Sequence, residues 1–321
     1  VNGRWANLMD YNVAWNGRDA DFLSVGETRG SGNRNSSLSI STRFEPHRFF
    51  EGTGILVPVS FSQNTNTSRP RFSAGDDIVR TGVLATQSET KTVSRSMTAS
   101  YSRIWNDRSN PFLRYTLGGF NANISRSTND SRSPTSVTNS TNVSAAVSYQ
   151  LSPRQWLPVP LPFTKTRLYP LPERFYWNYG VSTNKSTAFT RTFGSDVLVP
   201  SSSQNGRSAS IDFGVDSRPF DLLSHHAEGR RNLSLDGVRQ ERVGFINFGR
   251  LTSWRQSLNS HLALSPSPWL RPSFTWSSNY SQNNDTQSPN LSSRSIANGQ
   301  EMSVNWDLPF DRLVGSSPSM P

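Results

Sequence analysis

The feature of this sequence that most constrains its fold is a two-residue alternation of apolar and polar side chains. It is clearest over residues 174–191, RFYWNYGVSTNKSTAFTR. Every second position there holds a ring or a branched side chain, and the series is Phe175, Trp177, Tyr179 and Val181. Successive side chains of a β-strand point to opposite faces. The stretch therefore predicts a strand with one aromatic face and one polar face.

The same alternation recurs from end to end and predicts an all-β protein of about a dozen antiparallel strands. The strand candidates are residues 9–15, 38–44, 55–61, 97–101, 113–124, 143–151, 175–181, 209–215, 258–264, 274–280 and 302–308. In the candidate at 113–124 the alternation changes phase at Gly118-Gly119, which predicts a β-bulge. No long helix is expected.

Two kinds of connector are predicted between the strands. Asn16-Gly17 and Asn205-Gly206 have hairpin chemistry, because glycine tolerates the positive φ of a tight turn. Long loops rich in Ser, Asn, Thr and Pro are expected at about 62–75, 126–141 and 281–297. We find no domain boundary, so residues 1–321 are predicted to be one continuous stretch of β-structure.

The overall composition is polar, but it is not that of a disordered chain. Only 33% of the residues are hydrophobic and the formal net charge is +10, yet the chain holds 9 Trp, 8 Tyr and 18 Phe. Disordered segments are poor in aromatic residues, so we expect these periodically spaced rings to be buried against something. There is no cysteine, which excludes disulfides and thiolate metal sites within this chain.

The pattern favours a membrane barrel over a soluble β-sandwich. No run approaches the roughly 18 apolar residues of a membrane helix, but membrane strands need only about 9–11 residues, of which half face a wet lumen. The polar positions hold Ser, Asn, Asp and Arg, whereas a sandwich favours Lys, Glu and Thr on its outer face. Several tryptophans near strand ends suit an interfacial aromatic girdle, namely Trp5, Trp15, Trp105, Trp156, Trp254 and Trp269.

This interpretation assigns each face of the strands a solvent. The residues predicted to face lipid are Tyr11, Val13, Trp15, Phe175, Trp177, Tyr179, Val181, Phe213, Trp276 and Trp306. The residues predicted to face the lumen are Asn12, Asn178, Gly180, Ser182, Ser210, Asp212 and Asn305. An open sheet edge in hydrocarbon costs several kcal/mol per unpaired group, so about twelve strands must close or belong to a larger ring.

No catalytic, cofactor-binding or metal-binding constellation is predicted. His225-His226 with Glu228 is the nearest group to a metal site, but adjacent strand residues point to opposite faces. Residues 29–34, RGSGNR, lack the lysine of a phosphate-binding loop, and no Gly-x-Ser-x-Gly elbow occurs. The arginines do not follow the aromatic positions, which disfavours nucleic acid as a partner. We therefore expect no enzyme.

Three stretches resemble one known family. They are RFFEGTGILVPVSFSQNTNTSRPRF at 48–72, LPERFYWNYGVSTNKSTAFTR at 171–191, and the long run from FGRLTSWRQ to SVNWDLPF at 248–310. In order and spacing they are similar to the SprA/Sov family, the outer-membrane translocon of the type IX secretion system. The sequence departs from the family after Pro70, where RFSAGDDIV replaces a turn rich in proline and aspartate.

The resemblance implies a very large single-chain barrel in the bacterial outer membrane. Its lumen would pass folded or partly folded cargo proteins to the cell surface, gated by partner or plug proteins, with outer-membrane lipid around the wall. The start at Val1 and the end at SSPSMP suggest an internal fragment. About 12 tilted strands would close at roughly 24 Å diameter and 36 at roughly 70 Å, and only the larger ring passes a folded domain of about 35 Å.

Two alternatives stay open at this point. The first is a smaller outer-membrane barrel, porin-like or lipopolysaccharide-transporting, that closes with these strands. The second is a secreted β-rich adhesin or binding module. The barrel alternatives require detergent for extraction, whereas the adhesin predicts solubility without detergent.

Overall fold

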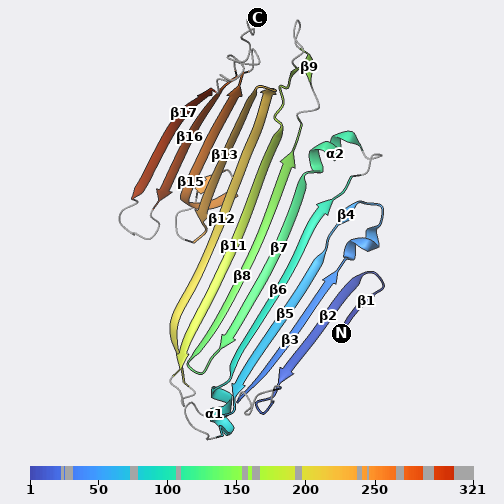
Figure 1. Ribbon diagram of the computed structural model, residues 1–321, viewed down its shortest axis with the longest axis vertical. Coiled ribbons are helices and arrows are strands. Elements are labelled where there is room, and N and C mark those ends of the chain that lie inside the picture. The colour runs from blue at the N-terminus through green and yellow to red at the C-terminus, as the bar shows by residue number, and fades with distance from the viewer. Residues whose placement is uncertain are drawn as a thin grey trace, which may run out of the picture. The chain divides into compact units, whose positions relative to one another are not determined.

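The computed structural model describes residues 1–22, 25, 32–72, 79–105, 110–153, 158–160, 167–191, 197–236, 241–243, 246–264, 271–284 and 293–306. Its principal element is an antiparallel sheet with the order β1-β2-β3-β5-β6-β7-β8-β11-β12-β13-β15-β16-β17 (Figure 1). Two short strands join it from the side, since β4 pairs with β6 and β14 with β15, while β9 and β10 form a separate pair. The predicted all-β antiparallel class is confirmed.

The strands of the main order are mostly much longer than those of a typical globular protein. Their bounds are β1 Asn2–Trp5, β2 Met9–Arg18, β3 Asn33–Phe44, β5 Val59–Pro70, β6 Thr90–Arg103, β7 Phe120–Arg132, β8 Ser136–Leu151, β11 Arg174–Arg191, β12 Leu198–Phe220, β13 Leu223–Ser234, β15 Ile246–Ala263, β16 Pro272–Asn284 and β17 Arg294–Trp306. The short ones are β4 Ile55–Leu56, β9 Val159–Pro160, β10 Arg167–Leu168 and β14 Glu241–Val243. The strand candidate at 175–181 lies in β11, which extends ten residues beyond it.

The helical elements are short and lie in connections between strands. They are the 3-10 helix η1 Pro46–Phe50 and the α-helices α1 Gly82–Gln87 and α2 Pro111–Leu117. None of the helices among the described residues is long and apolar enough to cross a membrane.

The prediction of a β-bulge at Gly118-Gly119 is wrong, because residues 111–117 form α2 rather than a strand. The side chain of Asn110 caps this helix by accepting a hydrogen bond from the backbone N–H of Phe112 at 2.9 Å, and Pro111 takes the first helical position. An Asn-Pro pair is a helix-start signal that the alternation of Leu113, Tyr115 and Leu117 obscures.

Both glycine turns are also wrong. Asn16 and Gly17 lie inside β2, paired with Ser37 and Ser36, and the ring of Trp15 covers the position where a Cβ of Gly17 would lie. Asn205-Gly206 lies inside β12, because β11 continues to Arg191 and its partner strand extends beside it.

The hairpin turn near the N-terminus lies instead at Ala6-Asn7. Both residues have positive φ, at 48° and 55°, and the backbone N–H of Leu8 donates to the carbonyl of Trp5. Two consecutive left-handed residues are the geometry of a two-residue hairpin turn, and asparagine tolerates it better than most residues.

Two of the three predicted loops are largely strand, since β5 continues to Pro70 and β7 and β8 leave only residues 133–135 between them. The loop predicted at 281–297 is strand only at its two ends, and residues 285–292 lie outside the described residues. A strand with water on one face can be rich in Ser, Thr and Asn, so this composition does not exclude a strand.

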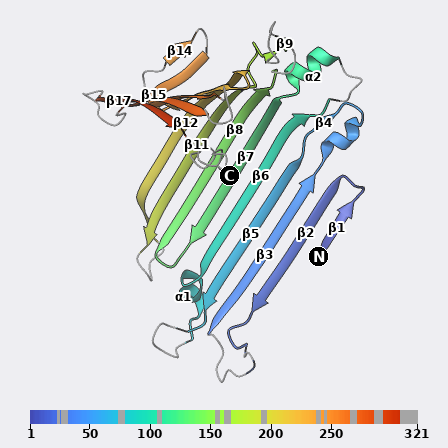
Figure 2. The same cartoon turned by 45° about the horizontal axis from the view of Figure 1, so that its top comes forward.

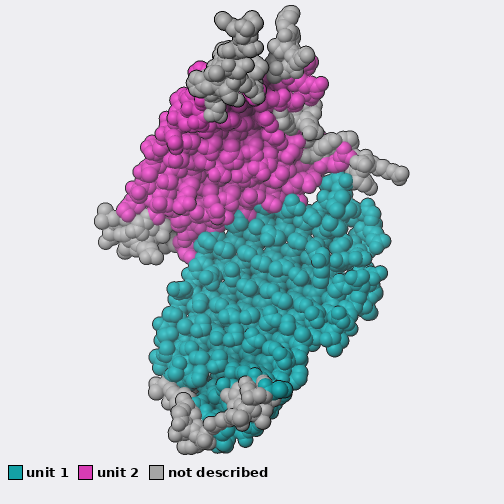
Figure 3. Space-filling model, viewed as in Figure 1, with its two compact units in different colours: residues 1–108, 121–147, 180–208 teal, residues 109–120, 148–179, 209–321 magenta. Residues whose placement is uncertain are grey.

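Compact packing divides the chain into two units, coloured separately in Figure 3. Unit 1 comprises residues 1–108, 121–147 and 180–208, and unit 2 comprises 109–120, 148–179 and 209–321. Both units contain parts of β8, β11 and β12. The single stretch predicted for 1–321 is thus one sheet by strand order, with two units by packing.

The described residues of the two units do not form the hydrophobic core of a globular domain. In Figure 2, strands β1 to β7 of unit 1 lie side by side in a single layer. The buried apolar side chains among the described residues are only Ala20, Ala209 and Leu233, whereas many large apolar side chains are exposed. The sheet therefore has two open faces, and its chemistry is that of the side chains on each face.

Candidate functional site: the two faces of the sheet

Over strands β5 to β7, the polar face of unit 1 is an uncharged surface of hydroxyl and amide groups. Cross-strand pairing places Ser62 of β5 opposite Ser96 of β6, and Ser96 opposite Ser127 of β7. Every second residue of β6, of β7 and of β5 as far as Ser68 lies on this face, and all of these residues are Ser, Thr or Asn. They are residues 60, 62, 64, 66 and 68 of β5, 90 to 102 at even numbers of β6, and 121 to 131 at odd numbers of β7.

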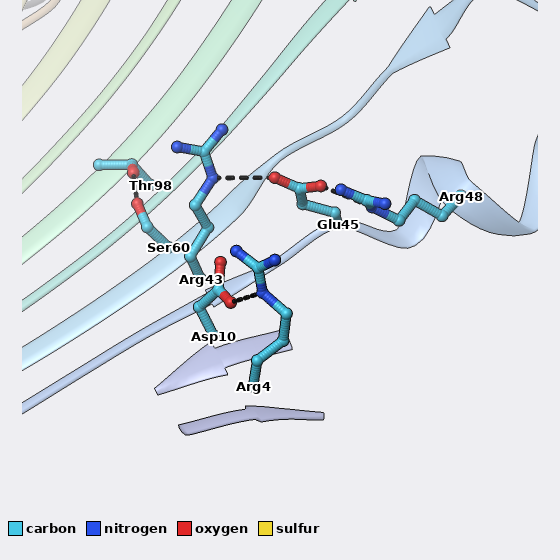
Figure 4. Close-up of polar contacts among 7 residues, drawn as sticks. All are labelled: Arg4, Asp10, Arg43, Glu45, Arg48, Ser60 and Thr98. Atoms are coloured by element: carbon cyan, nitrogen blue, oxygen red, sulfur yellow. Dashed lines mark hydrogen bonds and ion pairs between the residues drawn. The ribbon is translucent and has the colours of Figure 1, made fainter. Parts of the chain in front are cut away.

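Hydrogen bonds between these side chains connect neighbouring strands. The hydroxyl groups of Ser62 and Ser96 are 2.7 Å apart, and the hydroxyl of Ser94 donates to the side-chain oxygen of Asn129 at 2.7 Å. Ser60 and Thr98 form a similar pair (Figure 4). Hydroxyls that bond to one another across strands remain half-exposed and available to water, so the face is hydrated without carrying charge.

A small charged cluster lies at the edge of unit 1 formed by β1, β2 and β3, and Figure 4 shows it. The guanidinium of Arg4 contacts the carboxylate of Asp10 at 2.6 Å on neighbouring strands. Glu45, which lies between β3 and η1, is held by Arg43 at 3.2 Å and by Arg48 at 2.7 Å. The hydrogen bond from Arg48, helped by the charge of Arg43, holds the pKa of Glu45 below its ordinary value.

The polar face of unit 2 is charged. Asp216 of β12 accepts a hydrogen bond from Arg174 of β11 at 2.6 Å and contacts His226 of β13. Further along β12 and β13, Arg230 of β13 contacts Asp212 of β12 at 3.3 Å. His226 also lies 3.6 Å from Glu228. The charges on this face lie in a row of alternating sign that joins three strands.

The histidines form no metal site in the part of the chain that the structure describes. His225 and His226 point to opposite faces, as expected for adjacent strand residues. The ring of His225 lies 2.8 Å from the hydroxyl of Ser260, while His226 contacts Asp216. No group of three His, Asp or Glu side chains suited to a cation occurs among the described residues.

The opposite face of unit 1 is apolar and uncovered. Val13 and Trp15 of β2 lie directly opposite Ile40 and Leu38 of β3. The ring-bearing side chain of Trp15 is 72% exposed, and Met97 and Ile124 further along the face are 52% and 53% exposed. No described segment of protein covers these side chains.

Unit 2 has the same kind of apolar face. Phe274 and Trp276 of β16 lie opposite Val304 and Met302 of β17, and Pro272 lies opposite Trp306. Met302 is 72% exposed. On β11 the rings of Trp177 and Tyr179 are stacked, with centroids 6.3 Å apart.

The apolar segments shift regularly from strand to strand within unit 1. On β2 the segment 9–15 is centred on Asn12, and the row of cross-strand partners through Asn12 reaches β7 at Ser127. On β7 the apolar pair Ala122 and Ile124 is centred on residue 123, four residues from Ser127. Four strand-to-strand steps separate β2 from β7 in the sheet order, so the shift is about one residue per strand.

Unit 2 shows a shift of the same size. The row through Ser260, at the centre of the apolar positions 258–262 of β15, reaches β17 at Met302. The apolar segment 302–306 is centred on Val304, two residues away after two steps. With about 3.4 Å per residue and 4.8 Å between strands, one residue per strand is an angle of about 35°. A level apolar belt thus requires strands tilted by about 35°.

The structure separates the residues of the two predicted sets onto opposite faces. On β2, Tyr11, Val13 and Trp15 share the apolar face and Asn12 lies on the polar one. The other members predicted to face lipid lie at apolar-face positions, namely Phe175, Trp177, Tyr179, Val181, Phe213, Trp276 and Trp306. Those predicted to face the lumen lie at polar-face positions, namely Asn178, Gly180, Ser182, Ser210, Asp212 and Asn305. What covers each face stays a prediction.

Sequence reasoning missed two parts of these faces. The hydroxyl surface of β5 and β7 was hidden because segments 62–70 and 126–132 have the composition of loops. The charged pairs of unit 2 join residues far apart in sequence, such as Arg174 and Asp216, and no short motif announces them. Trp156 and Trp269 of the predicted girdle lie outside the described residues, and Trp254 lies within β15 rather than at its end.

Comparison with known proteins adds little. No family model matches the chain, and no curated protein matches it. Among solved structures, it is similar to the translocator domain of the autotransporter NalP from Neisseria meningitidis. The two sequences are 12% identical, the match covers 86% of this chain and 80% of that one, and the TM-score is 0.27. A TM-score this low supports no inference about fold or function.

Proposed function

We propose that this chain is a wall segment of an outer-membrane β-barrel that conducts proteins to the cell surface, as in the type IX translocon of the SprA/Sov family that it resembles. The observation that carries the proposal is the pair of unlike faces of one coreless sheet. One face is apolar, uncovered by protein and arranged as an oblique belt, while the other is hydrated. A single layer with these properties is stable where lipid covers one face and water the other.

The oblique belt supports the membrane assignment. Strands of membrane barrels are tilted by about 35–45°, and the belt is level with the membrane only if these strands tilt by about 35°. A soluble sandwich would instead cover its apolar face with a second sheet about 10 Å away. In the described residues no second sheet of comparable size exists, since the other sheet is the short pair β9 and β10.

The polar face supports conduction of proteins rather than tight binding of a ligand. The uncharged hydroxyl and amide surface of β5 to β7 binds water and offers a passing chain no apolar patch and no unpaired charge. In unit 2, Arg174 is paired with Asp216 and Arg230 with Asp212. Such a wall adheres weakly to cargo, and it requires no enzymatic step, cofactor or metal. Partner proteins would gate or plug the lumen.

The size of the ring is the finer part of the proposal. The sheet order gives β1 and β17 one neighbouring strand each, and hydrocarbon requires both edges to be paired. We propose that further strands complete a ring much larger than thirteen strands. The alternative is a small porin-like or lipopolysaccharide-transporting barrel, in which β1 and β17 pair with each other.

The first test uses the full-length protein from its native membrane fraction. We expect extraction only with detergent, a heat-modifiable band on gels, and a barrel near 70 Å across in electron micrographs. In the same protein, Asn2→Cys with Gln300→Cys should not form a disulfide, because these edges lie in different parts of the ring. A ready cross-link or a barrel near 24 Å supports the small barrel, and a particle soluble without detergent supports the adhesin.

A further inference from the structure

We propose that unit 1 binds the phosphate groups of lipopolysaccharide through a basic band on its lipid-facing side. The inference rests on the proposed membrane location. The basic band consists of six exposed cationic side chains beyond one margin of the apolar belt, namely Lys91, Arg95, Arg126, Arg132, Lys185 and Arg207. The proposal places the end of the sheet where β7 joins β8 in the outer leaflet of the membrane.

Four of these residues are placed on the apolar face by cross-strand pairing. Arg126 lies opposite Met97, so it shares the face of the apolar belt, and Arg95 is the next residue after Met97 on that face of β6. Toward the same end of the two strands, Lys91 lies directly opposite Arg132. Lys91 is four residues from Arg95 on β6, and Arg132 is six residues from Arg126 on β7. The strands β6 and β7 run side by side in Figure 2.

The other two residues reach the same face by alternation. The hydroxyl groups of Ser182 on β11 and Ser208 on β12 are 2.8 Å apart on the polar face. Lys185 and Arg207 have the opposite parity on their strands and therefore lie on the apolar face. On that face of β12, Arg207 is the neighbour of Ala209 on its N-terminal side. The apolar positions of β12 end at Ala209.

Around the β6 and β7 members of the basic band, positive charge exceeds negative charge. Two acidic residues lie near them, namely Asp130, 3.3 Å from Arg95, and Glu89, two residues before Lys91, which is paired with Arg69. Lys91 and Arg132 stand directly opposite each other, an arrangement that is destabilising unless an anion lies between them. The geometry therefore suits a ligand that brings negative charge.

The depth of the band selects the kind of lipid. Arg126 and Arg132 are six residues apart on one strand, which at about 3.4 Å per residue and a tilt of about 35° is about 17 Å along the membrane normal. The headgroup layer of a phospholipid leaflet is only about 5–8 Å deep. Cations at both depths fit a glycolipid whose phosphates extend outward from the membrane, which is lipopolysaccharide.

The test compares two variants of the full-length protein, purified in detergent from native outer membranes. Lys91→Gln with Arg132→Gln removes an opposed cationic pair from the lipid-facing side. Arg230→Gln with Arg255→Gln removes an equally opposed pair from the polar face. Lipopolysaccharide bound per folded, heat-modifiable protein is measured for each. A basic residue near an anionic surface is worth about 1 kcal/mol, so the first variant, which removes two, should lower affinity by about thirtyfold and the second should not change it.

Added lipids distinguish the sources of phosphate. Lipopolysaccharide should raise the temperature at which the wild-type band shifts, whereas phosphatidylglycerol vesicles and inorganic phosphate should have little effect. Equal binding by wild type and Lys91→Gln/Arg132→Gln overturns the proposal, as does equal stabilisation by phosphatidylglycerol. Detergent-independent solubility would instead contradict the proposed membrane function, before any lipid is added.

Discussion

The polar faces of the two units solve the same problem with different chemistry. In unit 1, strands β5 to β7 present only Ser, Thr and Asn, whose hydroxyl groups bond to one another. In unit 2, strands β11 to β13 present Arg174, Asp216, Arg230 and Asp212 in ion pairs, with His226 between two acidic groups. On both faces, polar side chains of neighbouring strands bond to one another.

The difference shows what a wet wall must avoid, which is unpaired charge. A neutral hydroxyl surface contributes little stability per bond, about 0.5–1.5 kcal/mol, but any member can be lost without leaving a charge behind. A charged surface fixes three strands more firmly, yet loss of one carboxylate leaves its partners uncompensated. The neutral face should therefore tolerate substitution and the charged face should not.

The largest expected effect tests whether the two faces of unit 2 differ in solvent at all. Trp177→Arg places a charge on the apolar face of β11 and should lower the free energy of unfolding by about 2–4 kcal/mol near the membrane midplane. Asn178→Arg, on the neighbouring residue and opposite face, should be tolerated. Refolding titrations of both variants in lipid give the measurement, and equal effects would refute the assignment of lipid and lumen.

The next effect tests the charged face of unit 2. Asp216→Asn removes the carboxylate that Arg174 and His226 share. Since all three side chains are partly exposed, water screens the loss, and we expect about 1–2 kcal/mol of destabilisation. The double variant Asp216→Asn/Arg174→Gln should recover part of it in a denaturant titration. If the double variant lost more unfolding free energy than the two single variants lose together, the pairing would be contradicted.

A smaller effect is expected on the neutral face of unit 1. Ser62→Ala removes one of the two hydroxyls of the pair with Ser96, and the remaining hydroxyl can bond to water. We expect a loss of about 0.5 kcal/mol or less by the same titration. A loss as large as that of Asp216→Asn would show that the contrast between the two faces does not hold.

The smallest effect depends on pH and concerns Glu45 at the edge of unit 1. Because the pKa of Glu45 is lowered in the folded state, its contribution is present above its ordinary pKa of about 4.3 and is lost as the pH falls through the lowered value. The difference in melting temperature between wild type and Glu45→Gln should thus be positive at pH 7 and shrink as the pH falls below about 4.3. A difference that stays constant as the pH falls would assign the effect to packing instead.

The sequence alone identified the sheet where apolar and polar residues contrast. The strand at 175–181 was predicted because rings alternate there with small polar groups, and β11 continues ten residues past this segment to Arg191. The stretch at 62–70 offers no such contrast, since SQNTNTS is polar on both faces where the strand extends past the apolar belt. Its strand structure comes from pairing with β3 and β6, which no local propensity encodes.

The parts of the site that depend on register were beyond reach for the same reason. Lys91 and Arg132 are 41 positions apart and become neighbours only when β6 and β7 pair in one register out of many. A shift of one residue would move every side chain to the other face. The alternation indicates which side chains share a face of one strand, whereas the basic band and the apolar belt require the order and register of all of them.

The hydroxyl surface of unit 1 also has a consequence for how such a protein changes over evolutionary time. Where a wall needs only small polar groups at alternate positions, one serine, threonine or asparagine can replace another at little cost. Selection would then act on the spacing of polar residues rather than on their identity. Distant homologues would keep the alternation of polar and apolar positions while most of their residues differ. Searches that score residue by residue are poorly suited to such proteins, and searches that score period and strand length are better matched to them.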